Sequence, residues 1–447
     1  MDKLFGTDGM RAVAGQFPLE YSAVYMLGKT LIKILHEKGL PPKVIIGRDT
    51  RESGEWLEQA MIHGIQDSQG EAISAGVIPT SAVSCLTKKH SFSSGVVISA
   101  SHNPYQYNGI KIFSHDGLKI PDNWEDTLEK AMQFSGQITP KKNIEIEYDS
   151  SLSQEYIEFL KTRFSMRFSP RKIKIICDCS NGASSFFAPR VLSDLGFDVT
   201  PIYAEPNGKN INAGCGSMHP ENLAKEVVEH KADIGIAYDG DADRAFWVDE
   251  KGKILNGDYT LLILAQFFQK QNKLKSDYIV ATTMSNLGLE KALEKLHIKL
   301  FRTQVGDKYV LEQMMRLHAN LGGEQSGHTI ILDECPTGDG ILTSIKMLEA
   351  MVSMNAPLST LAEGLKEYPQ VLKNVPISHK EDLENFSEIT KTITHIKQRL
   401  ADKGRLNVRF SGTEPVVRIM VEGENLEEIN KFANEIADSI SKHLGNL

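Results

Sequence analysis

The stretch GVVISASHNPYQYNGIK, residues 95–111, joins a short apolar run to a polar segment. Gly95–Ile98 are small or β-branched, which predicts a buried strand. The polar residues Ser99–Pro104 follow directly, so they lie where this strand ends, the place where α/β folds build their binding sites. The stretch therefore predicts a sheet of parallel or mixed strands with a site near Ser101.

The rest of the chain alternates short β-branched runs with amphipathic helices, which predicts α/β layers. Near the start, Leu27, Leu31, Ile34 and Leu35 have helical spacing, and a further helix is predicted over Ser184–Leu195. Because 447 residues exceed the size of one hydrophobic core, we expect several domains. We predict three similar mixed α/β domains and a smaller C-terminal α+β domain, at residues 1–152, 153–255, 256–367 and 368–447.

The composition argues against several classes of protein. The net charge is -8 and no basic stripe stands out, so a nucleic-acid partner is not expected. The longest strongly apolar run, Tyr259–Phe268, is far shorter than a membrane span, and the N-terminus lacks the apolar core of a signal peptide. The five cysteines show no paired framework, and we expect them to be reduced. We therefore expect a cytoplasmic protein with no membrane or nucleic-acid partner.

Ser101 is a candidate nucleophile, because a serine hydroxyl becomes reactive when a neighbour supplies or takes its proton. His102 and Lys111 are the candidates for that neighbour. The segment is equally compatible with a plain polar turn, since Ser, Asn and Pro are common turn residues.

A second polar segment, DGDADR at residues 239–244, also follows an apolar run. Three carboxylates at alternate positions can converge on one hard cation, and oxygen ligands suit Mg²⁺. An EF-hand is excluded because its sixth position requires Gly and is Arg244 here. A solvated acidic turn remains open, although three close carboxylates need a counter-charge.

Two glycine-containing segments have the chemistry to bind the rest of a substrate. GGEQSGH, residues 322–328, offers polar groups for sugar hydroxyls, and RFSGTEP, residues 409–415, offers hydroxyls and arginine for a phosphate. The alternatives are a Gly-rich turn and a capped hairpin turn. GTDGMR (6–11) and GDK (306–308) each place a cation beside a loop, and either is compatible with an ordinary turn.

Taken together, these segments resemble the motifs of the α-D-phosphohexomutase superfamily, in order and over the whole chain. Within it, Gln325 makes the chain most similar to the bacterial phosphoglucosamine mutases. The chain departs from that pattern at Ala12 and Ala242, where glycine is usual. The resemblance implies a four-domain architecture around a central cleft.

The resemblance also implies roles for individual residues. Ser101 would carry a phosphoryl group, and Asp239, Asp241 and Asp243 would hold one Mg²⁺ per chain together with an oxygen of the phosphorylated serine. Arg11, His102 and Lys111 would act near the reacting oxygen. Contacts to the substrate would come from Arg244, Lys308, Glu324, Ser326, His328, Arg409, Ser411, Gly412, Thr413 and Arg418.

The implied activity is the interconversion of glucosamine 6-phosphate and glucosamine 1-phosphate, with a 1,6-bisphosphate as intermediate and activator, feeding the synthesis of UDP-N-acetylglucosamine. A phosphomannomutase/phosphoglucomutase is the first alternative. The second is a non-catalytic regulatory protein that binds sugar phosphates. The expected partner is a small phosphosugar, and the sequence leaves a homodimer open.

Overall fold

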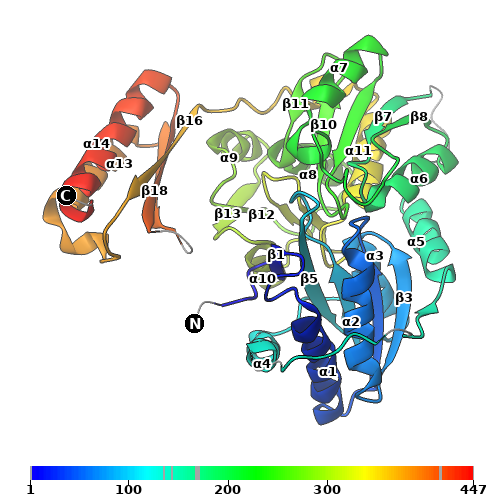
Figure 1. The fold of residues 1–447 in the computed structure, drawn as a ribbon. Coiled ribbons are helices and arrows are strands. Elements are labelled where there is room, and N and C mark those ends of the chain that lie inside the picture. Colours follow the sequence, from blue (N-terminus) through cyan, green and yellow to red (C-terminus); the bar gives the residue numbers. More distant parts are fainter. Residues whose placement is uncertain (1–2, 134–135, 142–143, 167–171, 412–414, 446–447) are drawn as a thin grey trace. The chain divides into compact units, whose positions relative to one another are not determined.

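The computed structural model describes residues 3–133, 136–141, 144–166, 172–411 and 415–445. The chain divides into two compact units (Figure 1). The first contains the residues up to Met284 together with His297–Glu363, and the second contains Ser285–Leu296 and Gly364–Leu447.

The first sheet of the larger unit has six strands in the order β1-β5-β4-β2-β3-β6. Helices α1 and α2 pack together on the face that carries Val44 and Ile46, and α3 packs on the face of Gly47 and Gly95. The strands are β1 Met10–Val13, β2 Lys43–Arg48, β3 Glu71–Val77, β4 Ser94–Ile98, β5 Tyr107–Ser114 and β6 Glu147–Tyr148, and the helices are α1 Tyr21–Glu37, α2 Gly54–Gln66, α3 Thr80–Lys89 and α4 Asp122–Gln133.

The second sheet has five strands in the order β11-β10-β9-β7-β8, in which β9, β7 and β8 are parallel and β10 is antiparallel to β9. Its elements, with α5 before it, are α5 Ser151–Thr162, β7 Lys174–Asp178, α6 Ala188–Asp194, β8 Asp198–Ile202, α7 Glu221–Glu229, β9 Ile234–Tyr238, β10 Ala245–Asp249 and β11 Ile254–Leu255, with 3₁₀ turns at Ala183–Phe186 and Gly216–Met218.

The third sheet has four strands in the order β13-β12-β14-β15. Helix α8 packs on β14 and β15, and α10 packs on β12 and β14. The elements are α8 Gly257–Lys270, β12 Tyr278–Thr282, β13 Lys299–Thr303, α10 Asp307–Leu317, β14 Leu321–Gly323, β15 Thr329–Ile331, α11 Gly340–Met354 and α12 Leu358–Ala362.

The smaller unit is a three-stranded antiparallel sheet in the order β16-β18-β17. Its apolar core joins the sheet to α13 and α14 through side chains such as Ile396, Val421 and Phe432. The elements are α9 Leu287–Glu294, β16 Gln370–Pro376, a 3₁₀ turn Leu383–Asn385, α13 Ser387–Leu400, β17 Gly404–Phe410, β18 Val416–Gly423 and α14 Leu426–Leu444. Among the described residues of the whole chain, no helix is long and apolar enough to cross a membrane.

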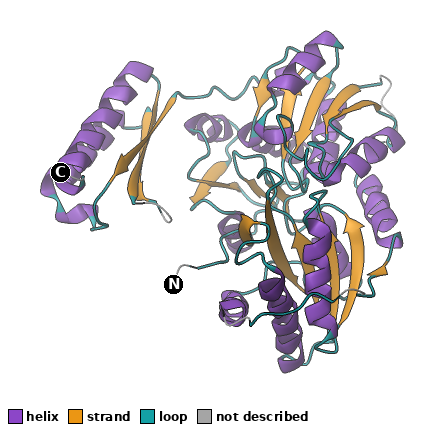
Figure 2. Ribbon diagram, in the orientation of Figure 1, coloured by secondary structure: helices purple, strands orange, loops and turns teal. Residues whose placement is uncertain are grey.

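The alternation of helices and strands confirms the predicted α/β class (Figure 2). The leucine and isoleucine side chains predicted to lie on one face of the first helix are buried on α1. One predicted helix is wrong in its extent: Ser184–Leu195 is a 3₁₀ turn followed by α6, which begins at Ala188. Pro189 lacks a backbone N–H and fits only the first turn of a helix, so the α-helix cannot extend back through it.

The segments expected to carry chemistry occupy equivalent places in the sheets. Residues 99–106 connect β4 to its antiparallel neighbour β5, residues 239–244 connect β9 to β10, and residues 324–328 connect β14 to β15. The strands β17 and β18, which flank residues 411–415, are antiparallel neighbours as well. Each segment therefore lies at the end of a strand whose position the sheet determines.

Candidate active site

The hydroxyl of Ser101 contacts the acidic loop, residues 239–244, that follows β9. Ser101 Oγ donates a hydrogen bond to Asp239 Oδ2 at 2.5 Å, across 138 residues of sequence, and both residues are buried. Gly240 makes this approach possible, because a Cβ atom there would lie 2.5 Å from the carbonyl oxygen of Ser101. The structure thus brings together the candidate nucleophile and the predicted metal ligands.

The backbone of Ser101 is held in an unusual conformation by its neighbours. Its φ is +51°, in the left-handed region that non-glycine residues rarely adopt. Arg51 donates to the carbonyl oxygens of Ser101 (3.0 Å) and Asn103 (2.8 Å), and Asn212 donates to the same two oxygens. These contacts offset the strain and direct the side chain towards Asp239.

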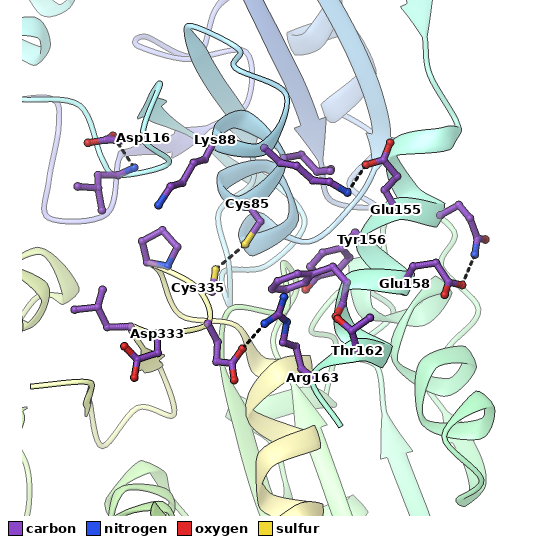
Figure 3. A pocket seen from close by; sticks show the side chains of 18 of the residues that line it. Cys85, Lys88, Asp116, Glu155, Tyr156, Glu158, Thr162, Arg163, Asp333 and Cys335 are labelled. Carbon is purple, nitrogen blue, oxygen red and sulfur yellow. Dashed lines mark hydrogen bonds and ion pairs between the residues drawn. The ribbon is translucent and has the colours of Figure 1, made fainter. Parts of the chain in front are cut away.

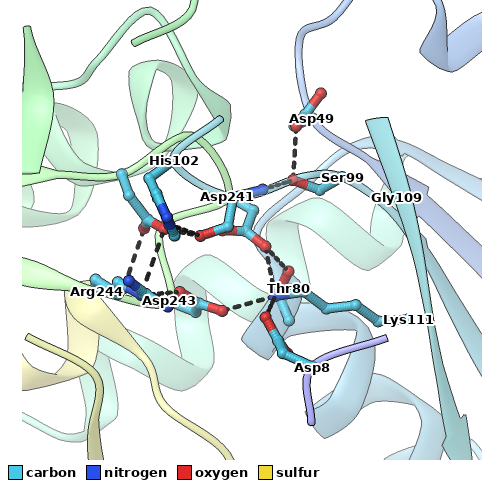
Figure 4. Close-up of polar contacts among 12 residues, drawn as sticks. Asp8, Asp49, Thr80, Ser99, His102, Gly109, Lys111, Asp241, Asp243 and Arg244 are labelled. Carbon is cyan, nitrogen blue, oxygen red and sulfur yellow. Dashed lines mark hydrogen bonds and ion pairs between the residues drawn. The ribbon is translucent and has the colours of Figure 1, made fainter. Parts of the chain in front are cut away.

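The three carboxylates of the acidic loop form one cluster. Oxygen atoms of Asp239, Asp241 and Asp243 lie within 4.8 Å of one another, and all three residues are buried. Lys111 Nζ lies 2.9 Å from Asp241 Oδ2 and 2.8 Å from Asp243 Oδ2, and Thr80 donates to Asp241 Oδ2 at 2.6 Å (Figure 4). The other oxygens, Oδ1 of Asp241 and of Asp243, accept no hydrogen bond from any described residue.

This arrangement fits a divalent cation. Buried carboxylate oxygens normally have partners, so two that accept no hydrogen bond indicate a site for a group that binds oxygen. Carboxylate oxygens are ligands that suit Mg²⁺. Burial, together with repulsion from Asp243 and Asp241, raises the pKa of Asp239 well above its ordinary value, and a cation would relieve that repulsion.

Cations of the chain surround the cluster. Burial lowers the pKa of Lys111, but Asp241 and Asp243 raise it more, so the ammonium stays charged. Burial opposes the ionisation of Asp243, but Lys111 lowers its pKa to about 2. The guanidinium of Arg244 lies 3.7 Å from Asp243 Oδ1 and 4.0 Å from Asp239 Oδ2.

His102 and Arg11 also lie close to Ser101 and the segment that follows it. His102 Nδ1 is 3.2 Å from Ser101 Oγ. Burial, with the positive charges of Arg244 and Arg11, lowers the pKa of His102 to about 4, so its imidazole is neutral at pH 7. Arg11 donates to Asp8 Oδ2 at 2.7 Å and to Asn103 Oδ1 at 3.5 Å.

The loop of residues 324–328 lies beside the acidic loop, because Arg244 and His328 form a β-bridge. Glu324 and Ser326 line a pocket of 460 Å³, in which Ser326 donates to Glu324 Oε2 at 3.1 Å. His328 is buried outside this pocket, with Nε2 3.8 Å from Asp307 Oδ2. Lys308 forms an ion pair with Asp122 of α4.

In the smaller unit, Arg409 and Arg418 are register partners on β17 and β18. Their side chains therefore leave the same face of this sheet. Ser411 is buried, and Lys380 donates to its carbonyl oxygen at 2.8 Å. Gly412 and Thr413 lie outside the described residues.

Several residues that hold the site were missed by the sequence analysis. Arg51 and Asp49 follow β2, Thr80 starts α3, and Asn212 lies in a long loop. Lys119 was missed as well, and it bridges Asp8 and Asp307. The segment Asp49–Arg51 carried a usable signal, because it follows an apolar strand just as Ser101 does.

Comparisons with known proteins assign a family to this chain. Four family models match: phosphoglucomutase/phosphomannomutase alpha/beta/alpha domain I over residues 2–137, domain II over 154–252, domain III over 256–368 and the C-terminal domain over 372–439. A phosphoglucosamine mutase of Solibacter usitatus is 43% identical over 444 residues, 99% of each chain.

Solved structures share the fold. A phosphoglucomutase/phosphomannomutase family protein from Burkholderia thailandensis has a TM-score of 0.82 at 22% identity, covering 98% of this chain and 97% of its own. An N-acetylphosphoglucosamine mutase from Aspergillus fumigatus, solved with GlcNAc-6P and magnesium, has a TM-score of 0.64 at 17% identity, covering 98% and 95%.

Proposed function

Since this chain belongs to the phosphoglucomutase/phosphomannomutase family, we propose that it interconverts glucosamine 6-phosphate and glucosamine 1-phosphate through phosphorylated Ser101. It is an isomerase of the phosphohexomutase type, as its curated relatives are. The observation that carries the mechanism is the hydrogen bond of 2.5 Å from Ser101 Oγ to Asp239 inside a buried acidic cluster. A protein that only binds sugar phosphates needs no such nucleophile.

The reaction consists of two transfers in opposite directions. The 1-hydroxyl of glucosamine 6-phosphate attacks the phosphorus on Ser101, the bond from phosphorus to Oγ breaks, and the proton of the sugar hydroxyl passes to Oγ. The products are a 1,6-bisphosphate and free Ser101. After the intermediate reorients, Oγ attacks the 6-phosphoryl group, its proton passes to the sugar oxygen, and glucosamine 1-phosphate leaves.

We assign the movement of these protons to His102, because Asp239, the closer group, is a proposed metal ligand. His102 is neutral at pH 7 because its pKa is lowered to about 4, and its Nδ1 is 3.2 Å from Ser101 Oγ. Lys111 is unsuited to that role, since two aspartates hold its proton. Its charge instead stabilises the phosphoryl group during transfer.

The charges around Ser101 support a requirement for Mg²⁺. Phosphorylation adds about 1.5 to 2 negative charges to a site that already holds three carboxylates. Lys111 and Arg244 supply two positive charges, so the site stays negative without a further cation. Asp239, Asp241, Asp243 and a phosphoserine oxygen would hold Mg²⁺, which neutralises charge on the transferred group.

The remaining contacts are assigned by the same hypothesis. Glu324 and Ser326 bind sugar hydroxyls in the 460 Å³ pocket, and the Gly306 amide holds the Glu324 carboxylate at 3.1 Å. Arg409 and Arg418 bind the non-reacting phosphate with the loop between them. Charged sugar phosphates are metabolites of the cytoplasm, where we place the enzyme.

Intact-mass analysis and a coupled mutase assay test the proposal. We expect a covalent phosphate on the wild type that Ser101→Ala lacks, with turnover abolished and restored by no concentration of Mg²⁺. Ser94→Ala is the control, because Ser94 starts β4, the strand that precedes Ser101, and its hydroxyl donates to the Phe113 carbonyl oxygen. A Ser101→Ala variant with near-normal turnover would reject the mechanism. Glucose or mannose phosphates that outcompete glucosamine phosphate would reject the substrate.

A further inference from the structure

Cys85 and Cys335 are 250 residues apart in sequence and meet in the larger unit. Their sulfur atoms are 2.9 Å apart and share a hydrogen bond (Figure 3). Cys85 lies in α3, and Cys335 lies in the segment between β15 and α11. All five cysteines of the chain are free thiols in this structure.

A chain of hydrogen bonds holds these two segments next to each other. Ser81, one turn before Cys85 on the same face of α3, bonds Tyr156 Oη at 2.9 Å. Tyr156 donates to Asp339 Oδ2 at 2.8 Å, and Asp339 in turn caps the N-terminus of α11. All three of these side chains are buried, so the packing fixes both cysteine backbones and not merely the flexible ends of two side chains.

Small molecules can reach the pair from one side. Cys85 and Cys335 both line a cavity of 940 Å³, together with Phe159, Arg163 and Pro336. Cys85 is half-buried and Cys335 is buried, so a reagent in the cavity meets Cys85 first. The remaining thiols, Cys177, Cys179 and Cys215, are buried and do not line this cavity.

We propose that Cys85 and Cys335 form a reversible disulfide when a small hydroperoxide enters this cavity. The Cys85 thiolate attacks one peroxide oxygen and the O–O bond breaks, giving a sulfenic acid and, with one proton, water or an alcohol. The Cys335 sulfur then attacks the Cys85 sulfur, and the S–O bond breaks. The thiol proton leaves with the hydroxyl as water, so two thiols are oxidised and one peroxide is reduced.

The order of attack follows from the environment of each thiol. The pKa of Cys335 is raised well above its ordinary value, mainly by the hydrogen bond with Cys85 and secondly by burial. Cys335 therefore remains a thiol. It is therefore a poor first nucleophile towards peroxide but is in contact with the sulfenic acid that forms on Cys85.

The bridge would join two segments that both contact the acidic loop. Thr80, at the start of α3, donates to Asp241 Oδ2 at 2.6 Å, and the Gly340 amide donates to the Ala242 carbonyl oxygen at 2.9 Å. A covalent link between residues 85 and 335 therefore ties together two supports of this loop. Because it closes a long stretch of chain, it restricts the unfolded state strongly.

The test uses the full chain, reduced, desalted and then exposed to hydrogen peroxide. After denaturation in a thiol-alkylating reagent, we expect five labelled thiols in the reduced protein and three in the oxidised protein, with one cross-linked peptide pair containing residues 85 and 335. Reduction with dithiothreitol should restore all five. The oxidised protein should also melt at a higher temperature than the reduced protein.

Serine variants separate this bond from other oxidation. Cys85→Ser and Cys335→Ser should each abolish the cross-link and the rise in melting temperature, whereas Cys215→Ser should keep both. The proposal is overturned if peroxide leaves all five thiols free, stops at sulfenic or sulfinic acid on Cys85, or joins Cys177 to Cys179 instead. None of these readouts depends on mutase activity, so the result stands independently of the proposed function.

Discussion

Replacing Arg51 with lysine should lower the activity of the site, although Arg51 is not among the residues proposed to bind the substrate. Arg51 is 1% exposed and donates to Asp49 and to the carbonyl oxygens of Ser101, Asn103, Pro104 and Tyr107, at 2.5–3.0 Å. A lysine keeps the charge but has three donors at one point, whereas the guanidinium presents a planar fork.

The magnitude follows from the contacts that are lost. At least two of the five bonds cannot be remade, and each bond to a charged donor contributes about 1.5–3 kcal/mol, so the loop loses on the order of 3 kcal/mol or more. A shift of roughly 1 Å in a reacting group costs about 100-fold in rate. We therefore expect kcat to fall about 100-fold in Arg51→Lys. KM should change little, because the hydrogen-bond partners of Arg51 among the described residues include none of those proposed to bind the sugar or its non-reacting phosphate.

A coupled mutase assay and a thermal melt measure the two effects. Arg48→Lys is the matched control, because Arg48 lies three residues earlier with its Nε 3.1 Å from Glu58, a pair that lysine can keep. This control should retain wild-type kcat. If Arg51→Lys keeps kcat within twofold and melts with the wild type, Arg51 does not position Ser101 and the reasoning is refuted.

Three further outcomes are expected. Ala242 has φ +59°, a left-handed conformation that strains any residue except glycine. Ala242→Gly should therefore raise the free energy of unfolding by about 1 kcal/mol, and a denaturant titration that gives a lower free energy for the variant than for the wild type would contradict this strain. Arg418→Ala should raise KM for the sugar phosphate by roughly 10-fold or more, from about 1.5–3 kcal/mol of lost bonding; an unchanged KM would remove Arg418 from the phosphate site. Burial raises the pKa of Asp178 from 3.8 to about 6, so its native carboxyl binds a proton more tightly than the unfolded one. The bound proton therefore stabilises the folded state by up to about 3 kcal/mol, a contribution that is complete below pH 4 and lost as the pH rises through 6. Wild type should therefore lose stability relative to Asp178→Asn over this range, and a constant difference would exclude the shift.

Much of the fold was predictable because local patterns and tertiary packing agree. The apolar spacing of Leu27, Leu31 and Leu35 predicted a helix, and these residues form the buried face of α1. α3 was not predicted, since Thr80–Lys89 has little apolar periodicity. Its residues become buried only because other elements cover them, a condition that no local pattern records.

Sequence by itself determined which groups the acidic site of the larger unit contains: a serine after one strand and three aspartates after another. Their order along the chain is distinctive, and the chemistry of each side chain is a local property. Tertiary structure alone decided which groups meet. It brought Ser101 into hydrogen-bond contact with Asp239 and Cys85 into contact with Cys335. It also paired Lys111 with two aspartates and Lys308 with Asp122. Contacts across 130 to 250 residues depend on how sheets and helices pack, and the energy of that packing is spread over many side chains.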